Sequence, residues 1–336
     1  QGRLEALLNY QTLVCELTGC ELSNASLLDE PTAVAEAMTL LYRVQKSSKN
    51  TFLLDSDALP QTKSVVITRA EAMGINVVIG DPDQAPEDCF AVLYQYPGAS
   101  GEIRDLTAGI RQHKENGTLV GVSADLLALT LLTPPGELGA DVVVGSSQRF
   151  GVPMGFGGPH AGYIAVKEAY KRSLPGRLVG ASIDAHGNPA FRLALQTREQ
   201  HIRREKATSN ICTAQVLLAI IAGMYGVYHG PEGLKGIAQR THSYMNDFVA
   251  SLTRSGYEVL TENWFDTITI KTLGKADLYV EKALQRGLNI RLIDSDHIGV
   301  SFDETTNREI VSNLLLAFTD NEPETGVASS LPEKLL

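Results

Sequence analysis

The stretch DVVVGSSQRFGVPMGFGGPHAGYIAV, residues 141–166, decides the fold of this chain. It reads as a strand, a turn, a glycine-rich loop and a second strand. Several cofactor-dependent enzymes present one reactive lysine from such a turn, because a lysine amine can bond to a carbonyl carbon. This chain has Gln148 where that lysine would stand. The sequence therefore raises the question of whether this site performs a different chemistry or belongs to one part of a larger catalyst.

The glycine-rich loop in this stretch does not indicate a nucleotide site. Gly155, Gly157 and Gly158 precede a strand, whereas a dinucleotide-binding fingerprint follows a strand and opens a helix. We expect these glycines to let the backbone pass close to a ligand or a partner subunit.

Strand-like and helix-like segments alternate on the N-terminal side of this stretch. The strand-like segments are short apolar runs at residues 50–55, 75–81, 90–97, 118–125, 140–147 and 160–166. Helix-like segments lie between several of them, and two further helices come first, the second with Asp29 as its cap and Pro31 in its first turn. This alternation predicts a mixed, mostly parallel sheet with helices on both faces. Ligands then bind at the carboxyl ends of the strands.

The pattern changes from about Phe191 onward. A charged segment leads into a long apolar helix, and the later helices and strands are typical of a small α+β domain. We predict a large α/β domain at residues 1–228, a small α+β domain at residues 229–318 and a polar linker at residues 319–336. This layout matches that of aspartate-aminotransferase-like enzymes, the pyridoxal-phosphate fold type I.

Composition excludes several classes of protein. With 29 Lys and Arg against 39 Asp and Glu, the formal charge is −10, which disfavours nucleic acid or an anionic membrane as the main partner. No apolar run has the ~18 to 20 residues of a membrane span. The four cysteines form no CxxC pair and no metal-ligand spacing, so we expect no metal site and a reducing compartment, the cytoplasm or the mitochondrial matrix.

Four motifs carry a resemblance to one family. They are SLLDEPTAVAEAM at 26–38, YPGASGEIRDL at 96–106, GSSQRFGVPMGFGGPHAGY at 145–163 and REKATSNICTAQ at 204–215. Together they resemble the N-terminal half of glycine decarboxylase, the P-protein of the glycine cleavage system, over essentially the whole chain. In that family two related aminotransferase-like halves exist, and only the second carries the lysine that forms an imine with pyridoxal phosphate.

The resemblance implies a role without covalent catalysis in this half. Gln148 falls where the lysine would be, and its amide nitrogen cannot form an imine because its lone pair is delocalised into the carbonyl. The family reaction decarboxylates glycine and transfers the aminomethyl group to the lipoyl arm of H-protein. We expect the cofactor on a catalytic C-terminal half, a homodimer or α2β2-like assembly, further chain on either side of these residues, and negligible activity of this chain alone.

The resemblance also implies which residues complete the site. The loop from Lys206 would reach the neighbouring half, where Thr208, Ser209 and Asn210 at the start of a helix suit the cofactor phosphate. Helix capping is the alternative for these three. Cys212, one turn into that helix, is a candidate redox-sensitive thiol, with a buried small hydrophobe as the alternative.

Other side chains have two interpretations each. Tyr94, Tyr96 and His160 are candidates to contact substrate or H-protein, with aromatic packing or a buried hydrogen-bonded histidine as the alternatives. Asp125, at the end of a strand, is a helix cap or a remnant of a residue that holds the cofactor ring in catalytic relatives. A basic run forms either a solvated face or an electropositive rim, and it contains Arg198, Arg203, Arg204 and Lys206.

Two further functional hypotheses remain open from the sequence. The chain could be an independent pyridoxal-phosphate lyase or aminotransferase that uses Lys167 or Lys206, although such lysines need burial or a cationic neighbour to lower their pKa. It could instead be a purely structural or regulatory subunit with no ligand contact.

Overall fold

The computed structural model describes residues 1–196, 200–207, 211 and 215–319. These residues form two compact units. Unit 1 comprises residues 1–96 and 105–230, and unit 2 comprises residues 97–104 together with the chain from Pro231 onward. Most of the linker predicted at 319–336 lies outside the described residues. No helix within the described part is both long enough and apolar enough to cross a bilayer.

Unit 1 is built around a seven-stranded sheet with the order β1-β7-β6-β5-β4-β2-β3. Its strands are β1 (Leu22–Ser23), β2 (Thr51–Asp55), β3 (Asn76–Gly80), β4 (Cys89–Tyr96), β5 (Leu119–Ala124), β6 (Val142–Ser146) and β7 (Gly162–Val166). Five neighbouring strands run parallel to one another, in the spatial order β6, β5, β4, β2 and β3. Strand β7 is antiparallel to β6, and β1 is antiparallel to β7. The predicted α/β fold with a mixed, mostly parallel sheet is confirmed.

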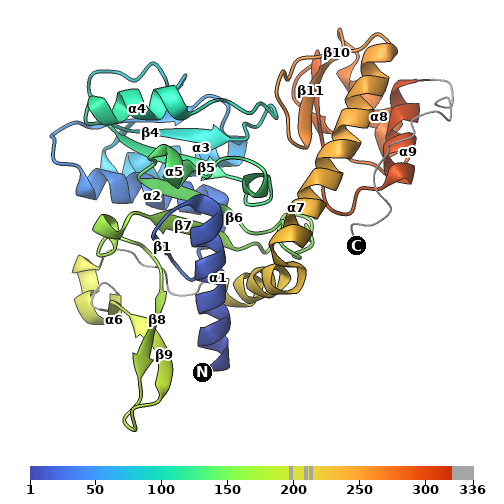
Figure 1. Cartoon of the computed structure of the whole chain (residues 1–336). Helices are drawn as coiled ribbons and strands as arrows, with labels where there is room; N and C mark the ends of the chain where they lie inside the picture. Colours follow the sequence, from blue (N-terminus) through green and yellow to red (C-terminus); the bar gives the residue numbers. More distant parts are fainter. Residues whose placement is uncertain (197–199, 208–210, 212–214, 320–336) are drawn as a thin grey trace. The chain divides into compact units, whose positions relative to one another are not determined.

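Helices cover the sheet of unit 1, with α4 on one face and α2 and α3 on the other (Figure 1). The helices are α1 (Gly2–Thr18), α2 (Glu30–Val44), α3 (Pro60–Met73), α4 (Thr107–Glu115) and α5 (Pro135–Leu138). Strands β2, β4 and β7 are buried along their whole length, as expected for strands covered on both faces. Their apolar runs therefore lack the alternation of a half-exposed strand.

Helix α2 shows how local sequence starts an element. The side chain of Asp29 accepts a hydrogen bond from the backbone N–H of Thr32 at 2.9 Å, and Pro31 lies in the first turn. Its apolar face packs with β2, β4 and β6 in the main core, which includes Met38, Phe52 and Phe90. The predicted cap and the proline position are confirmed.

The chain leaves the sheet of unit 1 through a hairpin that the sequence analysis did not anticipate. Strands β8 (Leu178–Ile183) and β9 (Pro189–Ala194) pair antiparallel as a separate two-stranded sheet. They are followed by the short α6 (Gln200–Arg203). The turn of the hairpin uses Gly187, whose φ is 84°, a backbone conformation that glycine adopts without steric cost.

Helix α7 (Val216–Arg254) is where the chain passes from unit 1 to unit 2. Gly230 interrupts it with φ 65° and ψ 178°, and Pro231 follows. Proline lacks the backbone N–H that helix continuation needs. Two helices, as expected from the sequence, therefore meet at Gly230 within the element labelled α7.

Unit 2 is an antiparallel α+β unit with the strand order β10-β11-β13-β12. The strands are β10 (Glu258–Val259), β11 (Thr267–Lys271), β12 (Arg291–Leu292) and β13 (His297–Ser301), with helices α8 (Ala276–Leu284) and α9 (Arg308–Phe318). Its core includes Phe248, Ile268, Val300 and Phe318.

The segment 97–104 also belongs to unit 2, although it lies far from the rest of this unit in sequence. The backbone carbonyl of Ser100 accepts hydrogen bonds from the hydroxyls of Thr261 and Thr269, each at 2.9 Å. A Cβ atom at Gly101 would lie only 2.0 Å from the carbonyl oxygen of Thr267. Only glycine therefore permits this close approach to β11.

Candidate functional site

The carboxyl ends of the parallel strands in unit 1 form one edge of the sheet, where ligands bind in open α/β folds. Polar residues end four of these strands or follow them directly. They include Asp55 on β2, Gln95 on β4, Ser123 and Asp125 at the end of β5, and Ser146 on β6. Two residues beyond Ser146 comes Gln148, so this edge is the candidate site.

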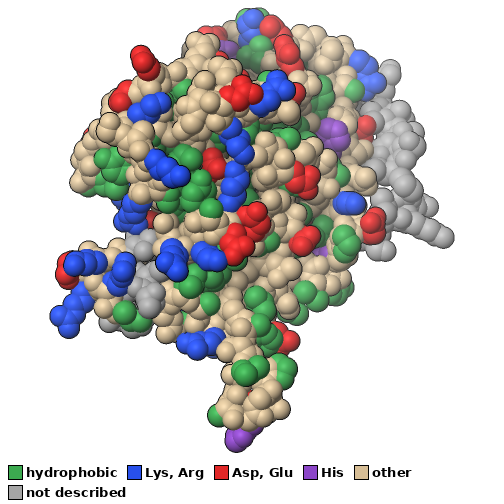
Figure 2. All heavy atoms as spheres, turned by 60° about the vertical axis from the view of Figure 1, so that its left-hand side comes forward, with side chains coloured by type: hydrophobic (Ala, Val, Ile, Leu, Met, Phe, Trp, Pro, Cys, Tyr) green, Lys and Arg blue, Asp and Glu red, His purple; other side chains and the backbone are tan. Residues whose placement is uncertain are grey.

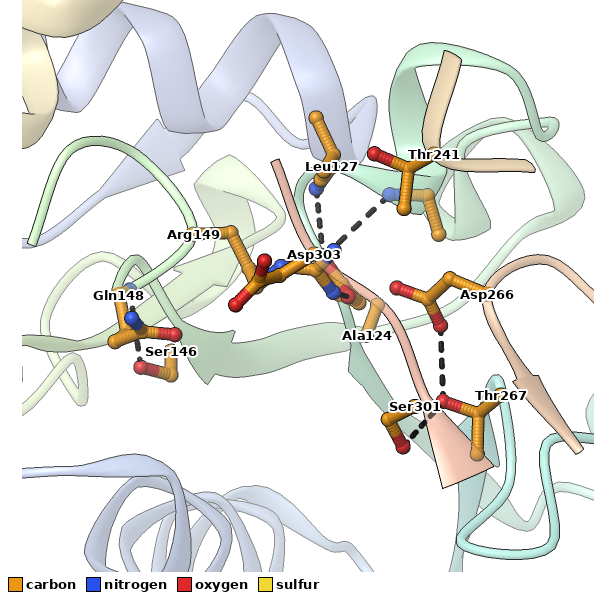
Figure 3. Close-up of polar contacts among 12 residues, drawn as sticks. Ala124, Leu127, Ser146, Gln148, Arg149, Thr241, Asp266, Thr267, Ser301 and Asp303 are labelled. Atoms are coloured by element: carbon orange, nitrogen blue, oxygen red, sulfur yellow. Dashed lines mark hydrogen bonds and ion pairs between the residues drawn. The ribbon is translucent and has the colours of Figure 1, made fainter. Parts of the chain in front are cut away.

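Gln148 is held by contacts within its own turn. Its backbone N–H donates to the hydroxyl of Ser146 at 3.2 Å, and its side-chain Nε2 donates to the carbonyl of Val152 at 2.5 Å. Figure 3 shows the side chain of Gln148 beside Ser146, whereas that of Arg149 extends away from both. The amide of Gln148 thus closes the loop that leads into the glycine-rich segment.

Arg149 forms an ion pair with Asp125. The guanidinium Nη1 lies 2.6 Å from Oδ2 of Asp125. The other carboxylate oxygen, Oδ1, accepts from the backbone N–H of Leu127 at 2.7 Å and from that of Ala128 at 3.5 Å. Both oxygens of Asp125 are therefore engaged. Its Oδ1 accepts from N–H groups at the start of the short turn Ala128–Thr130, whose N-cap is Leu127, so Asp125 supports the turn without being its N-cap residue.

Sequence reasoning missed Arg149, although a signal for it was present. The residue follows Gln148 directly, so a cation stands beside the position expected for the lysine. Its partner Asp125 lies 24 residues earlier, and only the pairing of β5 with β6 brings the two together.

Glu30 is a second carboxyl group at this edge that sequence reasoning did not single out. It is the first residue of α2, and its Oε1 accepts from the hydroxyl of Ser123 at 2.8 Å and from Nε2 of Gln95 at 3.2 Å. Burial raises the pKa of Glu30, and the neighbouring carboxylates of Asp125 and Asp29 raise it further, while the two hydrogen bonds lower it.

Asp55 links two neighbouring strands at the same edge. Its Oδ2 accepts from the backbone N–H of Gln95 at 3.2 Å, and its Oδ1 accepts from the backbone N–H of Asp57 at 2.9 Å. The side chain is buried. Asp55 thus binds the end of β2 to β4 and supports the backbone from which Gln95 projects.

The two tyrosines predicted to contact substrate or partner are both buried. The hydroxyl of Tyr94 donates to Oδ1 of Asp83 at 2.6 Å, and its ring centroid lies 6.2 Å from that of His113. These contacts support the packing alternative for Tyr94. Burial raises the pKa of Tyr96, and the carboxylate of Asp105 raises it further.

His160 lies half-buried at the end of the glycine-rich loop, with Nε2 3.3 Å from the carbonyl oxygen of Met154. This contact gives the imidazole ring of His160 a structural role within the loop. Direct contact of His160 with a substrate or a partner stays a prediction.

Lys167 lies at the opposite edge of the sheet from Gln148. Because β7 runs antiparallel to β6, its carboxyl end meets the amino ends of the parallel strands. There the Nζ of Lys167 donates to Oδ1 of Asp141 at 2.7 Å and to the carbonyl of Gly139 at 3.0 Å. This placement argues against Lys167 as a substitute for the missing lysine. Lys167 is also ion-paired there with Asp141.

The basic run near α6 is a surface feature. Arg203, Arg204 and Lys206 are all exposed, and Figure 2 shows Lys and Arg side chains gathered on this part of unit 1. Thr208, Ser209, Asn210, Cys212 and Arg198, to which the sequence analysis gave roles, lie outside the described residues.

Within the described ranges, no group of three or more His, Cys, Asp or Glu side chains is arranged to hold a metal ion. The chemistry available at the carboxyl edge is hydrogen bonding and charge pairing through Glu30, Gln95, Asp125 and Arg149.

Comparison with protein families supports the motif-based interpretation. The family model described as "Glycine cleavage system P-protein" matches residues 1–318. A glycine dehydrogenase (decarboxylating) of Cupriavidus metallidurans is 58% identical over 312 residues, which is 93% of this chain and 32% of the relative. That of Cereibacter sphaeroides strain KD131 is 54% identical over 339 residues, which is 100% of this chain and 35% of the relative. The chain thus spans about a third of the length of these curated relatives.

Solved structures agree with this similarity. A glycine decarboxylase (P-protein) of the glycine cleavage system, crystallised in inhibitor-bound form, superposes with a TM-score of 0.88 at 34% identity, over 94% of this chain and 75% of the other. An alanine–glyoxylate aminotransferase of a Nostoc species superposes with a TM-score of 0.63 at 14% identity, over 94% of this chain and 85% of the other. The second likeness shows the fold alone, and it is the predicted aminotransferase-like fold.

Proposed function

Because this chain belongs to the glycine cleavage system P-protein family, we propose that it is the N-terminal, lysine-free half of a glycine dehydrogenase (decarboxylating). The observation that carries the proposal is Gln148 at the carboxyl edge of the sheet, with its amide donating to the carbonyl of Val152. An amide cannot form the covalent link to pyridoxal phosphate that a lysine amine forms. This half therefore supports the reaction without carrying the cofactor covalently.

The residues of this chain do not fit a covalently held pyridoxal phosphate. Gln148 replaces the amine, and the two oxygens of Asp125 are engaged by Arg149 and by the backbone N–H groups of a helical turn. A cofactor ring nitrogen would have to displace one of these partners. We infer that the cofactor is held by a catalytic C-terminal half.

The whole protein would then release carbon dioxide from glycine and transfer the remaining aminomethyl group to the lipoyl arm of H-protein. In this division of labour, the chain completes the cofactor site of its neighbour through Thr208, Ser209 and Asn210 and forms part of the surface that H-protein approaches. The assembly would be a homodimer of fused chains or an α2β2-like complex. The positions of Lys167 and Gln148 at opposite edges of the sheet disfavour an independent enzyme that uses Lys167.

The first test is mass spectrometry of the chain after incubation with pyridoxal phosphate and borohydride, which makes a lysine adduct permanent. We expect no stoichiometric adduct on this chain and one adduct on the catalytic half when the two are mixed. One dominant adduct on a lysine of this chain would contradict the proposal. Release of carbon dioxide from glycine by this chain alone, in proportion to its concentration, would contradict it as well.

The second test addresses completion of the neighbouring site. Thr208→Ala and Asn210→Ala should weaken cofactor binding by the reconstituted enzyme about tenfold or more, because each removes a donor to an anionic phosphate. The matched control is Thr305→Ala. Thr305 lies in a loop of unit 2, and among the described contacts its hydroxyl donates only to Asp303. Unchanged cofactor affinity in both loop variants would favour a purely structural subunit.

A further inference from the structure

The carboxyl edge of the sheet holds two side-chain oxygens that lack a donor. Oε1 of Gln95 is buried and accepts no hydrogen bond, and Gln95 as a whole is only 8% exposed. In Glu30, both hydrogen bonds from Ser123 and Gln95 go to Oε1, and none of the described residues donates to Oε2. A buried acceptor without a donor, such as Oε1 of Gln95, is rare because it loses water without compensation. Glu30 is only half-buried, and its Oε2 is not one of the buried oxygens without a donor.

The two oxygens belong to one cluster. The Nε2 of Gln95 donates to the carboxylate of Glu30 at 3.2 Å, and Oε1 is bonded to the same carbon as that Nε2. The amide oxygen of Gln95 therefore belongs to the same planar group that contacts the carboxylate of Glu30. Glu30 remains half-buried, so the cluster is open to water at one point.

The charges around Glu30 favour a cation. Asp29 and Asp125 both repel a negative charge on Glu30, and Asp55 holds the backbone N–H of Gln95. The hydroxyl of Tyr163, whose pKa is raised well above its usual value by burial, donates to the carbonyl of Ala124 and stays neutral.

The positive charge of Arg149 at this edge is paired with a different carboxylate. Arg149 lies 2.6 Å from Asp125, so it offsets one carboxylate and leaves Glu30 without a cationic partner among the described ion pairs. A ligand that brings one positive charge and several N–H donors would satisfy both the charge and the two free acceptors.

We propose that Glu30 and Gln95 form a binding site for a small primary ammonium group in this half of the protein. An ammonium group has three donors and no acceptor, so it can donate to Oε2 of Glu30 and to Oε1 of Gln95 together. A hard metal cation fits less well, because it requires about six oxygen ligands. The inference does not depend on the proposed function, because it concerns only the residues of this chain.

A proton competes with the ammonium group for Glu30. Burial raises the pKa of Glu30, so its protonated form persists above the usual range of a carboxylic acid, and only the ionised form attracts a cation. Affinity should therefore increase as the pH rises through the pKa of Glu30, by up to about tenfold per pH unit below that pKa. Each ammonium bound in this range should release one proton.

The test is saturation-transfer NMR of methylammonium with the 336-residue chain, titrated at several values between about pH 5 and pH 8. Glu30→Gln keeps the shape and the acceptor for Ser123 but removes the charge, and it should weaken binding about tenfold or more. Gln95→Met removes the second acceptor and should weaken binding less. The matched control is Glu71→Gln, an exposed carboxylate near the end of α3, which should leave binding unchanged.

Competition experiments with other small ions identify the kind of ligand that the site binds. Glycine and methylammonium should compete for the site, whereas acetate should not. Potassium, a cation of similar size without N–H donors, should compete poorly. Equal binding to Glu30→Gln, an affinity independent of pH, or equally strong competition by potassium would overturn the proposal, and circular dichroism of each variant separates loss of binding from loss of folding.

Discussion

The two edges of the seven-stranded sheet each carry a short ion pair, and the pairs serve different purposes. At the carboxyl edge, Arg149 lies 2.6 Å from Asp125. At the amino edge, Lys167 lies 2.7 Å from Asp141. The chemistry of the two pairs is similar, but only the carboxyl edge holds the carboxyl ends of the five parallel strands. The comparison teaches that strand direction decides which pair lies at the candidate site.

The two carboxylates also differ in what depends on them. Asp141 is buried. Its Oδ1 accepts from Lys167, and its Oδ2 accepts from the backbone N–H of Val120 at 2.9 Å. Asp125 is more exposed and supports a short helical turn. The amino-edge pair therefore holds the sheet itself together, and the carboxyl-edge pair shapes a turn and a loop.

The largest expected effect is that of Asp141→Ala. Its removal leaves the N–H of Val120 without its acceptor and the ammonium of Lys167 without its counter-charge, with only the carbonyl of Gly139 remaining. The free energy of unfolding should therefore fall by about 3 kcal/mol. Urea denaturation followed by circular dichroism measures the change. Asp141→Asn, which keeps an acceptor for Val120, should lose less, and an equal loss in the two variants would show that charge alone matters.

Asp125→Ala should have a smaller effect, about 2 kcal/mol, because the hydrogen bonds that support a turn and a partly exposed ion pair are lost. The same urea experiment measures it. In Arg149→Met the hydrogen bonds to the turn remain, so that variant should be the milder of the two. A loss for Asp125→Ala that exceeds the loss for Asp141→Ala would reverse the ranking of the two edges.

Glu30→Gln should change how stability depends on pH. The folded-state pKa of Glu30 is raised by burial, so its contribution is fully present at acidic pH and is lost as the pH rises through that raised pKa. The variant removes this loss, and its stability relative to the parent chain should increase from acidic to neutral pH. Urea midpoints at several pH values check this, and a constant difference would contradict it.

The smallest expected effect is that of Gln148→Lys. A lysine restored beside an engaged Asp125 should still give no stoichiometric adduct with pyridoxal phosphate, because Arg149 continues to occupy that carboxylate. Borohydride reduction and mass spectrometry detect any adduct. A full adduct in the single variant would show that the Arg149–Asp125 pair does not obstruct the cofactor, and comparison with Gln148→Lys combined with Arg149→Met would sharpen the result.

Much of unit 1 could be predicted because its signals are local. The cap and proline of α2 lie two residues apart in sequence, and continuous apolar runs indicate strands covered on both faces. The family resemblance also rested on contiguous motifs. The β8–β9 hairpin pairs residues close in sequence around a turn at Gly187, a local signal that the sequence analysis did not use. The attachment of residues 97–104 to unit 2 gave no comparable local signal, because it depends on partners distant in sequence.

The sequence by itself determined the fold class, the helix caps and the presence of Gln148 in place of a lysine, because each of these depends on residue types and their spacing. Only the tertiary structure decided what surrounds Gln148. The contact of Arg149 with Asp125 and that of Glu30 with Ser123 join residues 24 and 93 positions apart. The antiparallel direction of β7 placed Lys167 at the far edge. Strand pairing brings these groups together or separates them, and no local pattern of residues encodes that outcome.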